Sequence, residues 1–327
     1  MSIALDAMGG DHAPSEIIRG ALEAAPALKG KLLLVGQREI VESHLPTEVP
    51  ANIEVVPASE CVDMDEKPLE AYRRKKDSSI IVGAQLVKDG RADAFVSAGN
   101  TGACSATCLL IWRQIEKVHR PAIASQIPNL HGEFLLLDAG ASPDVDPEHL
   151  VEFAIMGRAY SEKVMGHPNP KVHLLNIGEE EGKGNAFAKQ SYKLLQKHAW
   201  FAGNIEGKDM YSKPVDVVVC DAFVGNTVLK TSEGVAELII QMIKQQIPTH
   251  PILRLAYAPL KKVMAPLRKR MDYAEVGGSP LLGLNGLCTI CHGRSNAKAI
   301  KNALLMTQKA IDNRLVETIR ESAAREL

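Results

Sequence analysis

A glycine-rich stretch in the middle of the chain carries residues well suited to binding an anion. Residues 172–177 form a mostly apolar run typical of a buried strand, and residues 178–184 then contain three glycines, three glutamates and Lys183. A strand that turns through glycines into a helix leaves unpaired backbone N–H groups, where phosphates bind in open α/β sheets. The spacing differs from the nucleoside triphosphatase P-loop, since Gly184 and not Ser or Thr follows Lys183. The stretch therefore predicts an anion site of another kind.

Glycine or asparagine follows an apolar run at four predicted strand ends in all. These ends are Asp6 with Gly9 and Gly10, residues 97–103, residues 178–185 and residues 221–226. The carboxyl ends of parallel strands meet at one edge of a sheet, so the four turns favour a shared cleft over unrelated tight connections. Lys183 and Lys230 are the nearest cations, although a single helix lysine such as Lys230 is more often only a surface residue.

The glutamates at 179–181 do not suit a simple phosphate cradle. They could form a solvated lip, pair with the lysines, or bind a metal together with Asp221, and we favour the first two roles. Three histidines, His12, His131 and His292, lie near glycines but have no Ser or Cys partner at motif spacing. A nucleophile triad is therefore not predicted.

Strand patterns alternate with helix patterns along the chain, which predicts a mostly parallel sheet covered by helices. We expect strands at 2–7, 31–35, 53–57, 94–97, 122–127, 133–138, 171–177, 201–204 and 215–220. Helices are expected at 15–27, 37–44, 77–88, 101–112, 147–165 and 186–198, after Asn226 to about 247, and from 295 to near the C-terminus. No repeat or low-complexity linker divides the chain, so we expect one domain over 1–327, with two lobes as the alternative.

Composition excludes several classes of protein. The chain has 46% hydrophobic residues, a net charge of -1 and 4% aromatic residues, which disfavours disorder and nucleic-acid binding. It has neither a secretory signal nor an apolar run of roughly 18 residues, so we expect a cytoplasmic protein. Cys288, Cys291 and His292 match the spacing of c-type haem attachment, but the missing export signal disfavours haem, and zinc lacks a second cysteine pair.

Two basic segments each have two interpretations. Residues 251–272 alternate apolar and basic side chains near helical spacing, so an arm at about 248–273 could lie on an anionic membrane or pack against a second subunit. We favour the inter-subunit arm slightly, and the two roles are compatible. The cluster Arg73, Arg74, Lys75 and Lys76 is usually a solvated face, and otherwise a docking patch for an acidic carrier or a phosphate.

Eight motifs in order carry a resemblance over essentially the whole chain. They are residues 6–11 with Pro14, 73–79, 97–103, 120–122, 175–185, 203–209, 225–230, and 277–283 with His292, Gly293 and Ser295. Together they closely resemble the bacterial phosphate acyltransferases of phospholipid synthesis. Two departures stand out: Ser142 replaces a usual Asn, and Ala222 replaces a usual Gly. Ala222 would be strained if its position requires a positive φ.

The resemblance implies a three-layer α/β/α homodimer like the isocitrate and isopropylmalate dehydrogenases and the phosphotransacetylases, with a protruding amphipathic segment. It also implies transfer of a long acyl chain from acyl carrier protein to inorganic phosphate, without a cofactor or metal. The acyl phosphate would pass to a membrane glycerol-3-phosphate acyltransferase, so we expect a cytoplasmic protein peripherally associated with the membrane.

That chemistry needs positioned cations and N–H donors rather than an enzyme nucleophile, because phosphate itself can attack a thioester. We assign catalysis to Lys183 and Asn226. The expected phosphate and substrate contacts are Asp6, Gly99, Asn100, Thr101, Gly102, Asn185, Asp221, Gly225, Lys230, Gly278 and His292. The carrier would dock on Arg73, Arg74, Lys75 and Lys76, and the membrane would contact Leu255, Leu260, Lys261, Lys262 and Arg268.

Two rival functions are weighed against this interpretation. An NAD-dependent decarboxylating dehydrogenase on the same fold would need magnesium-binding aspartates and an arginine cluster, and only Asp216 and Asp221 are suggestive. A non-enzymatic membrane scaffold would leave the four glycine turns unexplained.

Overall fold

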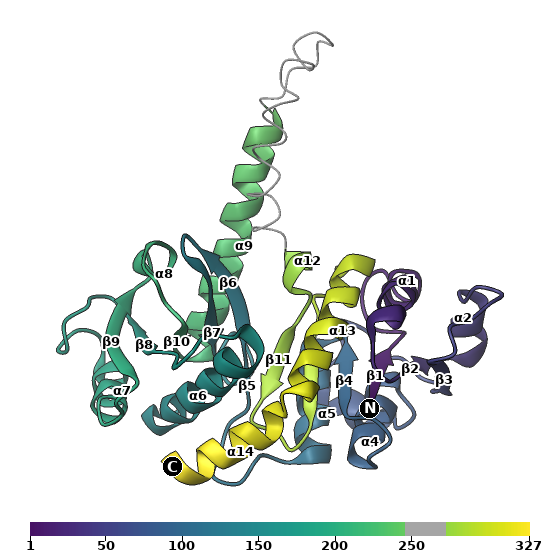
Figure 1. Ribbon diagram of the computed structural model, residues 1–327, viewed down its shortest axis with the longest axis horizontal. Helices are drawn as coiled ribbons and strands as arrows, with labels where there is room; N and C mark the ends of the chain where they lie inside the picture. The colour runs from purple at the N-terminus through teal and green to yellow at the C-terminus, as the bar shows by residue number, and fades with distance from the viewer. Residues whose placement is uncertain (246–272) are drawn as a thin grey trace.

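The computed structural model describes residues 1–245 and 273–327, and within them two sheets organise the chain (Figure 1). The larger sheet has seven strands in the order β3-β2-β1-β4-β12-β11-β5, and the smaller has five in the order β6-β7-β10-β8-β9. The larger comprises β1 (Ser2–Asp6), β2 (Lys31–Gly36), β3 (Ile53–Pro57), β4 (Ala94–Ser97), β5 (Ala122–Ile123), β11 (Ser279–Leu282) and β12 (Leu287–Ile290). The smaller comprises β6 (Ser125–Asn129), β7 (Gly132–Leu137), β8 (Val172–Asn176), β9 (Phe201–Glu206) and β10 (Val217–Val219).

Most strand pairs are parallel, as the alternating pattern predicts. The antiparallel pairs among the described strands are β6 with β7 and β11 with both β5 and β12. The helices are α1 (Ser15–Ala24), α2 (Arg38–Ser43), α3 (Pro68–Arg74), α4 (Ser79–Lys88), α5 (Thr101–Trp112), α6 (Pro147–Tyr160), α7 (Ala186–Leu195), α8 (Asp209–Ser212), α9 (Ala222–Gln245), α12 (Tyr273–Val276), α13 (Ala297–Asp312) and α14 (Leu315–Glu326).

Both faces of the larger sheet are buried, which explains its nearly continuous apolar strands. Ile3 and Leu5 of β1 pack with α1 and α13, whereas Ala4 between them faces the core that contains α4 and α5. The smaller sheet divides in the same way, with Leu135 and Leu137 of β7 facing α6 and Leu136 facing the opposite side. The α6 core also includes residues of the larger sheet, so one continuous core joins the two sheets.

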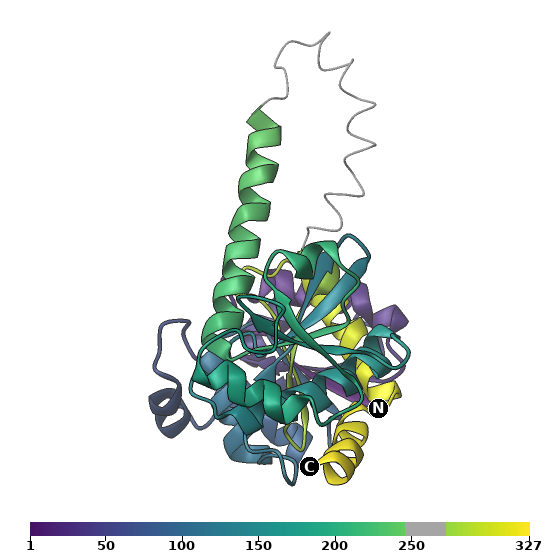
Figure 2. The same ribbon diagram turned by 90° about the vertical axis from the view of Figure 1, so that its left-hand side faces the viewer.

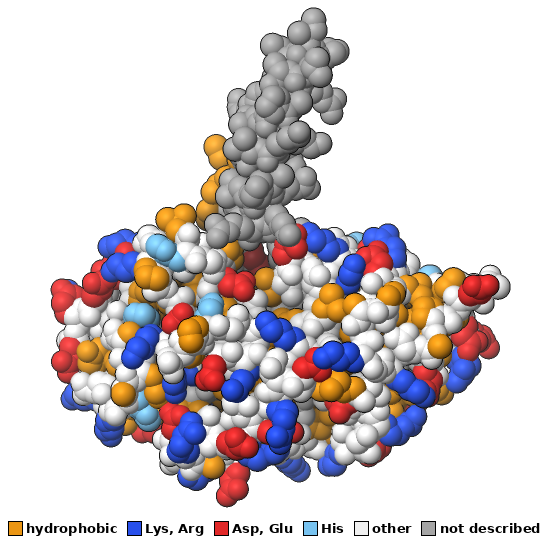
Figure 3. All heavy atoms as spheres, viewed as in Figure 1, with side chains coloured by type: hydrophobic (Ala, Val, Ile, Leu, Met, Phe, Trp, Pro, Cys, Tyr) orange, Lys and Arg blue, Asp and Glu red, His pale blue; other side chains and the backbone are white. Residues whose placement is uncertain are grey.

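Helix α9 departs from this layered arrangement. It begins beside the smaller sheet and then projects away from the body (Figures 1 and 2). Its outer turns expose Val235, Leu238, Ile239 and Met242, and Figure 3 shows hydrophobic side chains where it leaves the body. No described helix has the length and apolar character needed to cross a membrane. The predicted arm at about 248–273 lies almost entirely outside the described residues.

Several local predictions were wrong where single residues break a pattern. The last helix is two helices, because Asn313 ends α13 and Arg314 adopts a left-handed conformation with φ 51°. The strand expected over 122–127 divides at Ala124 into β5 and β6, which belong to different sheets. The strands β11 and β12 and the helix α3 were not predicted, since each is short and lies in a sequence with many glycines or charges.

A buried carboxylate fixes the turn that follows β7. Asp138 is fully buried, and its carboxylate accepts N–H groups from Ile123 (2.9 Å), Gly140 (3.0 Å), Ala141 (3.0 Å) and Ser142 (2.7 Å). Burial raises the pKa of Asp138, and the four backbone donors oppose that rise because they favour the charged form. One side chain therefore ties β5 of the larger sheet to the β7 turn of the smaller sheet.

We predict that Asp138→Asn lowers the free energy of unfolding by about 1–3 kcal/mol, because its amide nitrogen would face the Ser142 N–H that the carboxylate now satisfies. Asp138→Ala should cost more, since all four donors would lose their acceptor. Urea denaturation measures both changes. Asp89→Asn, at an exposed position bonded to Gln85, is the control, and an Asp138→Asn effect no larger than the control would contradict the prediction.

Candidate functional site

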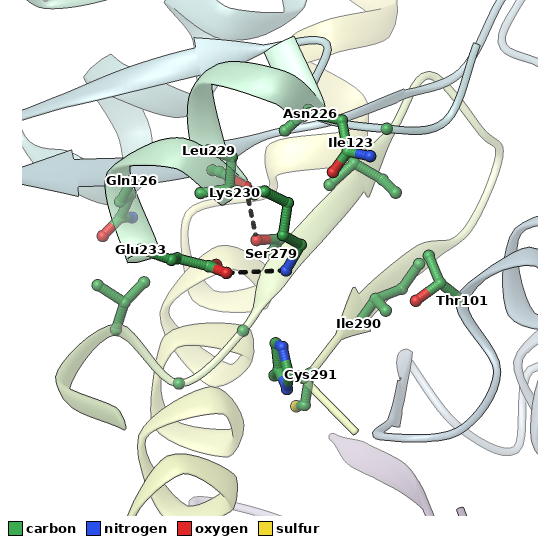
Figure 4. Close-up of a pocket in the computed structure, with 17 residues that line it drawn as sticks. Thr101, Ile123, Gln126, Asn226, Leu229, Lys230, Glu233, Ser279, Ile290 and Cys291 are labelled. Carbon is green, nitrogen blue, oxygen red and sulfur yellow. Dashed lines mark hydrogen bonds and ion pairs between the residues drawn. The ribbon is translucent and has the colours of Figure 1, made fainter. Parts of the chain in front are cut away.

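A cavity of about 340 Å³, called here the polar cavity, lies where the two sheets meet (Figure 4). It opens beside the carboxyl ends of β4, β7 and β12 and the start of α9. Its lining residues are Thr101, Ile123, Ser125, Gln126, Ala139, Gly140, Asn226, Leu229, Lys230, Glu233, Val276, Gly277, Gly278, Ser279, Ile290, Cys291 and His292. Five predicted site residues are thus brought together, namely Thr101, Asn226, Lys230, Gly278 and His292.

Helix α5 begins at this cavity, whereas α9 begins beside it and passes along it from Asn226 onward. The segment 221–226, expected as a turn, contains the first turn of α9. Thr101 is the first residue of α5, and the Asn100 side chain caps that helix by accepting the Ala103 N–H at 2.9 Å. At the start of α9, Asp221 accepts the Val224 N–H at 2.9 Å, and Asn226 follows in the next turn. Helix N-termini carry partial positive charge, so the start of α5 favours an anion in the cavity.

Helix α9 supplies the polar side chains on one wall. Asn226, Lys230 and Glu233 are spaced by about one helical turn and all face the cavity, while Thr101 lies across it (Figure 4). The Lys230 ammonium donates to the Glu233 carboxylate at 2.9 Å. The side-chain amide of Asn226 has no hydrogen-bond partner among the described residues, so its N–H groups are available to a ligand.

His292 adds a histidine whose environment favours the neutral ring. Burial lowers its pKa, and the nearby Lys230 ammonium lowers it further. The Nδ1 atom accepts the Arg294 N–H at 3.1 Å, which assigns the proton of the neutral ring to Nε2. The ring can therefore donate a hydrogen bond without adding charge.

Other predicted residues shape the cavity edge from outside it. The Asn100 amide donates to the carbonyls of Met64 (2.9 Å) and Glu66 (3.0 Å), so it fastens that loop over the start of α5. Asp6 is buried, which raises its pKa, and it accepts the Ser97 hydroxyl at 2.7 Å.

Four predicted glycines lie at close approaches around these turns. Gly99 donates its N–H to the Ser97 hydroxyl at 3.0 Å, and Gly102 lies against Pro68. A Cβ on Gly225 would stand 1.9 Å from the Asp138 carbonyl oxygen, and one on Gly278 would stand 2.7 Å from Thr289. Any side chain at Gly225 would therefore push α9 off the β7 turn.

The glycine-rich stretch after β8 lies apart from the polar cavity. Asn185 caps α7 by accepting the Ala188 N–H at 2.8 Å, and together with Asp221 it lines a separate polar hollow of about 460 Å³. Lys183 lines neither space. Its side chain is half exposed, and its ammonium lies 3.8 Å from the Glu180 carboxylate.

Two of the three glutamates of this stretch form ion pairs, one with the predicted partner Lys183 and one with Lys213, which was not predicted. Glu180 lies near Lys183, and Glu179 pairs with Lys213. Among the described residues, no group of three or more His, Cys, Asp or Glu side chains is arranged to hold a metal.

The basic cluster at the end of α3 contains two residues with interaction partners and two without an ion-pair partner among the described residues. Lys75 forms a salt bridge with Glu66, and the Lys76 ammonium lies 4.2 Å from the centre of the Tyr72 ring. Arg73 and Arg74 are exposed and have no ion-pair partner among the described residues. The predicted membrane contacts Leu255, Leu260, Lys261, Lys262 and Arg268 lie outside the described residues.

The two departures from the family motifs fit their positions. The buried Ser142 hydroxyl donates to the Pro121 carbonyl at 2.9 Å, and its N–H bonds Asp138. Ala222 begins α9 and is not among the residues with positive φ, so the expected strain is absent.

Sequence reasoning missed Gln126, Glu233 and Ser279 as cavity residues. Glu233 carried a weak signal, since it lies three residues after Lys230 on one helix.

Comparison with known proteins places this geometry in a family. A sequence profile described as "Fatty acid synthesis protein" matches residues 1–318. A phosphate acyltransferase of Desulfitobacterium hafniense (strain DSM 10664 / DCB-2) is 50% identical over 328 aligned residues, covering 99% of this chain and 98% of the relative. One from Brevibacillus brevis is 44% identical, covering 98% and 97%.

Solved structures of similar fold support the predicted fold class at low sequence identity. A phosphotransacetylase from Streptococcus pyogenes aligns with a TM-score of 0.61 at 18% identity, covering 95% of this chain and 94% of that one. A 4-hydroxythreonine-4-phosphate dehydrogenase from Klebsiella pneumoniae aligns with a TM-score of 0.52 at 14% identity, covering 94% and 98%. The predicted α/β fold related to phosphotransacetylases and dehydrogenases is thereby confirmed. The chain therefore belongs to the fatty acid synthesis protein family, and it is similar over nearly its whole length to phosphate acyltransferases.

Proposed function

We propose that this protein transfers a long-chain acyl group from acyl carrier protein to inorganic phosphate and so supplies acyl phosphate for phospholipid synthesis. The observation that carries the proposal is the convergence of Asn226, Lys230, Thr101 and His292 on one cavity at the N-terminus of α5. These groups offer a cation and several donors to an anion. Family membership supplies the reaction class, and the relatives named above are phosphate acyltransferases.

The reaction needs no enzyme nucleophile. A phosphate oxygen attacks the thioester carbonyl carbon, a carbon–oxygen bond forms, and the carbonyl oxygen becomes an oxyanion. The carbon–sulfur bond then breaks, and the proton of hydrogen phosphate passes to the departing thiolate. Acyl phosphate and the carrier thiol are the products, so atoms and charge balance.

The cavity residues divide between the two anions of this reaction. Lys230, Thr101 and the neutral His292 would hold phosphate, while the unpartnered Asn226 amide would donate to the oxyanion. Because Lys230 pairs with Glu233 at 2.9 Å, phosphate must compete with that carboxylate. Asp6, Gly99, Asn100, Gly102, Gly225 and Gly278 would shape the cavity. Asn185 and Asp221 line the separate polar hollow of about 460 Å³ and would contribute to substrate binding at the edge of that hollow.

Lys183 has a different place in the proposal. It would act on the same anions only if the loop 178–185 moves toward α9, releasing Glu180. The open surroundings of Gly182, where an added Cβ would meet no atom within 4 Å, leave room for such movement.

We further propose a homodimer that associates peripherally with anionic membranes, passing acyl phosphate to a membrane glycerol-3-phosphate acyltransferase. The amphipathic sequence at about 248–273 supports this, with Leu255, Leu260, Lys261, Lys262 and Arg268 as the membrane contacts. The exposed apolar side chains on the outer turns of α9 lie next to it in the sequence.

We predict that Asn226→Ala lowers kcat by roughly 100- to 1000-fold, the usual effect of removing one oxyanion donor. Acyl phosphate formed from acyl carrier protein thioester and saturating phosphate is the measurement. Asn226→Asp should not restore activity, since its carboxylate would repel both anions. Glu237→Ala, on the same helix but outside the cavity, is the control. A kcat for Asn226→Ala close to the control value would remove Asn226 from the mechanism.

We predict that Lys183→Ala lowers turnover by at least about 100-fold while leaving the fold intact, because the closed loop would lose its cation. Lys189→Ala in the following helix should be close to wild type. The same phosphate-dependent assay, with circular dichroism as the test of folding, measures both variants. Near-normal turnover of a folded Lys183→Ala protein would show that Lys183 remains in the salt bridge with Glu180 throughout the reaction.

We predict that charge reversal at Arg73 and Arg74 raises the KM for the acidic carrier substrate by about tenfold at low salt, with less effect at high salt. An acyl thioester without the carrier protein should react equally well with the variant and the wild type. Arg91→Glu, at another exposed arginine, tests for a general charge effect. An unchanged carrier KM would mean that the cluster is only a solvated face.

A further inference from the structure

A larger and more apolar space, called here the apolar groove, adjoins the polar cavity along α9. This apolar groove has a volume of about 610 Å³, and its walls come from α9, β6, α8 and the end of α12. Gln126, Leu229, Glu233 and Val276 line both the groove and the polar cavity. The two spaces therefore meet at a neck formed by these four residues, two of them from α9.

The helix presents different sides to the two spaces. At 3.6 residues per turn, Asn226 and Lys230 lie on one side of α9, and Val228, Val235 and Ile239 lie far round the helix from them. Asn226 and Lys230 line the polar cavity but not the groove. Val228, Val235 and Ile239 line the groove but not the polar cavity. A ligand that occupies both spaces would have a polar end near the start of α9 and an apolar end further along it.

Three hydroxyl groups that line the groove already have hydrogen-bond partners within the protein. The Thr227 hydroxyl donates to the Phe223 carbonyl at 2.7 Å, and the Ser232 hydroxyl donates to the Val228 carbonyl at 2.6 Å. The Tyr211 hydroxyl hydrogen-bonds to that of Ser232. Because these hydroxyls are engaged and most other lining residues are apolar, the groove suits a hydrocarbon.

Apolar side chains in the groove are also unusually accessible. Val235 is 49% exposed and Ile239 is 42% exposed, although both line a concave surface. Exposed apolar concavities of this kind are typical of ligand-binding sites.

We propose that the groove binds the alkyl tail of the transferred acyl group while the thioester carbonyl lies in the polar cavity. This inference rests on the proposed function and adds to it the location of the tail and the feature that limits its length. The shared neck favours an alkyl chain over a second protein as occupant, because the reacting carbonyl and its tail are covalently continuous across it.

The groove has the dimension that a long chain requires. Ten residues separate Leu229 at the neck from Ile239 at the far wall, a rise of about 15 Å along the helix. A carbon–carbon bond of about 1.5 Å advances an extended chain by roughly 1.25 Å, so the groove accommodates roughly twelve bonds beyond the neck. Each buried methylene should strengthen binding by about fourfold until the groove is filled.

Ala236→Phe tests the proposal, since Ala236 lines the groove but not the polar cavity. It lies seven residues past Leu229, about 10 Å along the helix, so a phenyl ring there would obstruct a palmitoyl tail and spare an octanoyl one. We expect kcat/KM to fall about tenfold or more with palmitoyl carrier protein and less than about twofold with octanoyl carrier protein.

Leu238→Phe is the matched control, because it places the same ring on a neighbouring residue of α9 that lines neither space. It should leave the ratio of the two kcat/KM values unchanged. If Ala236→Phe does not fold, Ile239→Glu gives a second test, with Leu238→Glu as its control. Its carboxylate at the far wall should lower kcat/KM for palmitoyl and spare octanoyl.

The outcomes separate this inference from the function on which it rests. Wild-type protein that forms no acyl phosphate from either substrate would overturn both. Active protein whose chain-length preference is the same in the groove variants and their controls would overturn the groove alone. Light scattering tests the remaining occupant: a groove variant that changes the oligomeric state without changing chain-length preference would identify the groove as a subunit interface and refute the tail site.

Discussion

The contact between the β7 turn and the first turn of α9 is the constraint on which the rest of the site depends. Asp138 holds its turn with a buried carboxylate, and its own carbonyl oxygen leaves room only for a glycine at position 225. The next residue is Asn226, so the packing of that glycine fixes where the amide points. Lys230 and Glu233 follow from the same helical rotation. A single close contact between backbone atoms thereby sets the position of one whole wall of the cavity.

The sequence was sufficient to predict the alternating architecture and the chemistry of its turns. Buried parallel strands such as β1 and β4 are mostly apolar on both faces, and glycines follow where the chain leaves the sheet. Thr101, Asn226 and Lys230 were predicted for this reason. The strands β11 and β12 were missed, because four-residue strands beside glycines have too few positions to establish a period. Without them, Ser279 could not be assigned to the cavity.

The arrangement of the turns around the cleft was harder to predict than their existence. Four turns at one edge do not all face one space, since the strands that they follow belong to two sheets and differ in their order. The turn after β8 follows the strand next to β10, and it borders the separate polar hollow instead of the polar cavity. Strand order depends on long-range pairing, about which local spacing carries no information. Local patterns therefore identified Lys183 as a candidate but could not specify its distance from Asn226.

Helix α9 has a mechanical consequence that its separate parts do not reveal. Its 24 residues form one continuous rod about 36 Å long, and the rod carries both the polar wall of the cavity and one wall of the groove. A rod transmits displacement along its length, so anything that tilts or slides its outer half also moves the amide and the ammonium at its base. The outer half would thus act as a lever, through which a contact far from the reacting atoms would shift the alignment of the two substrates.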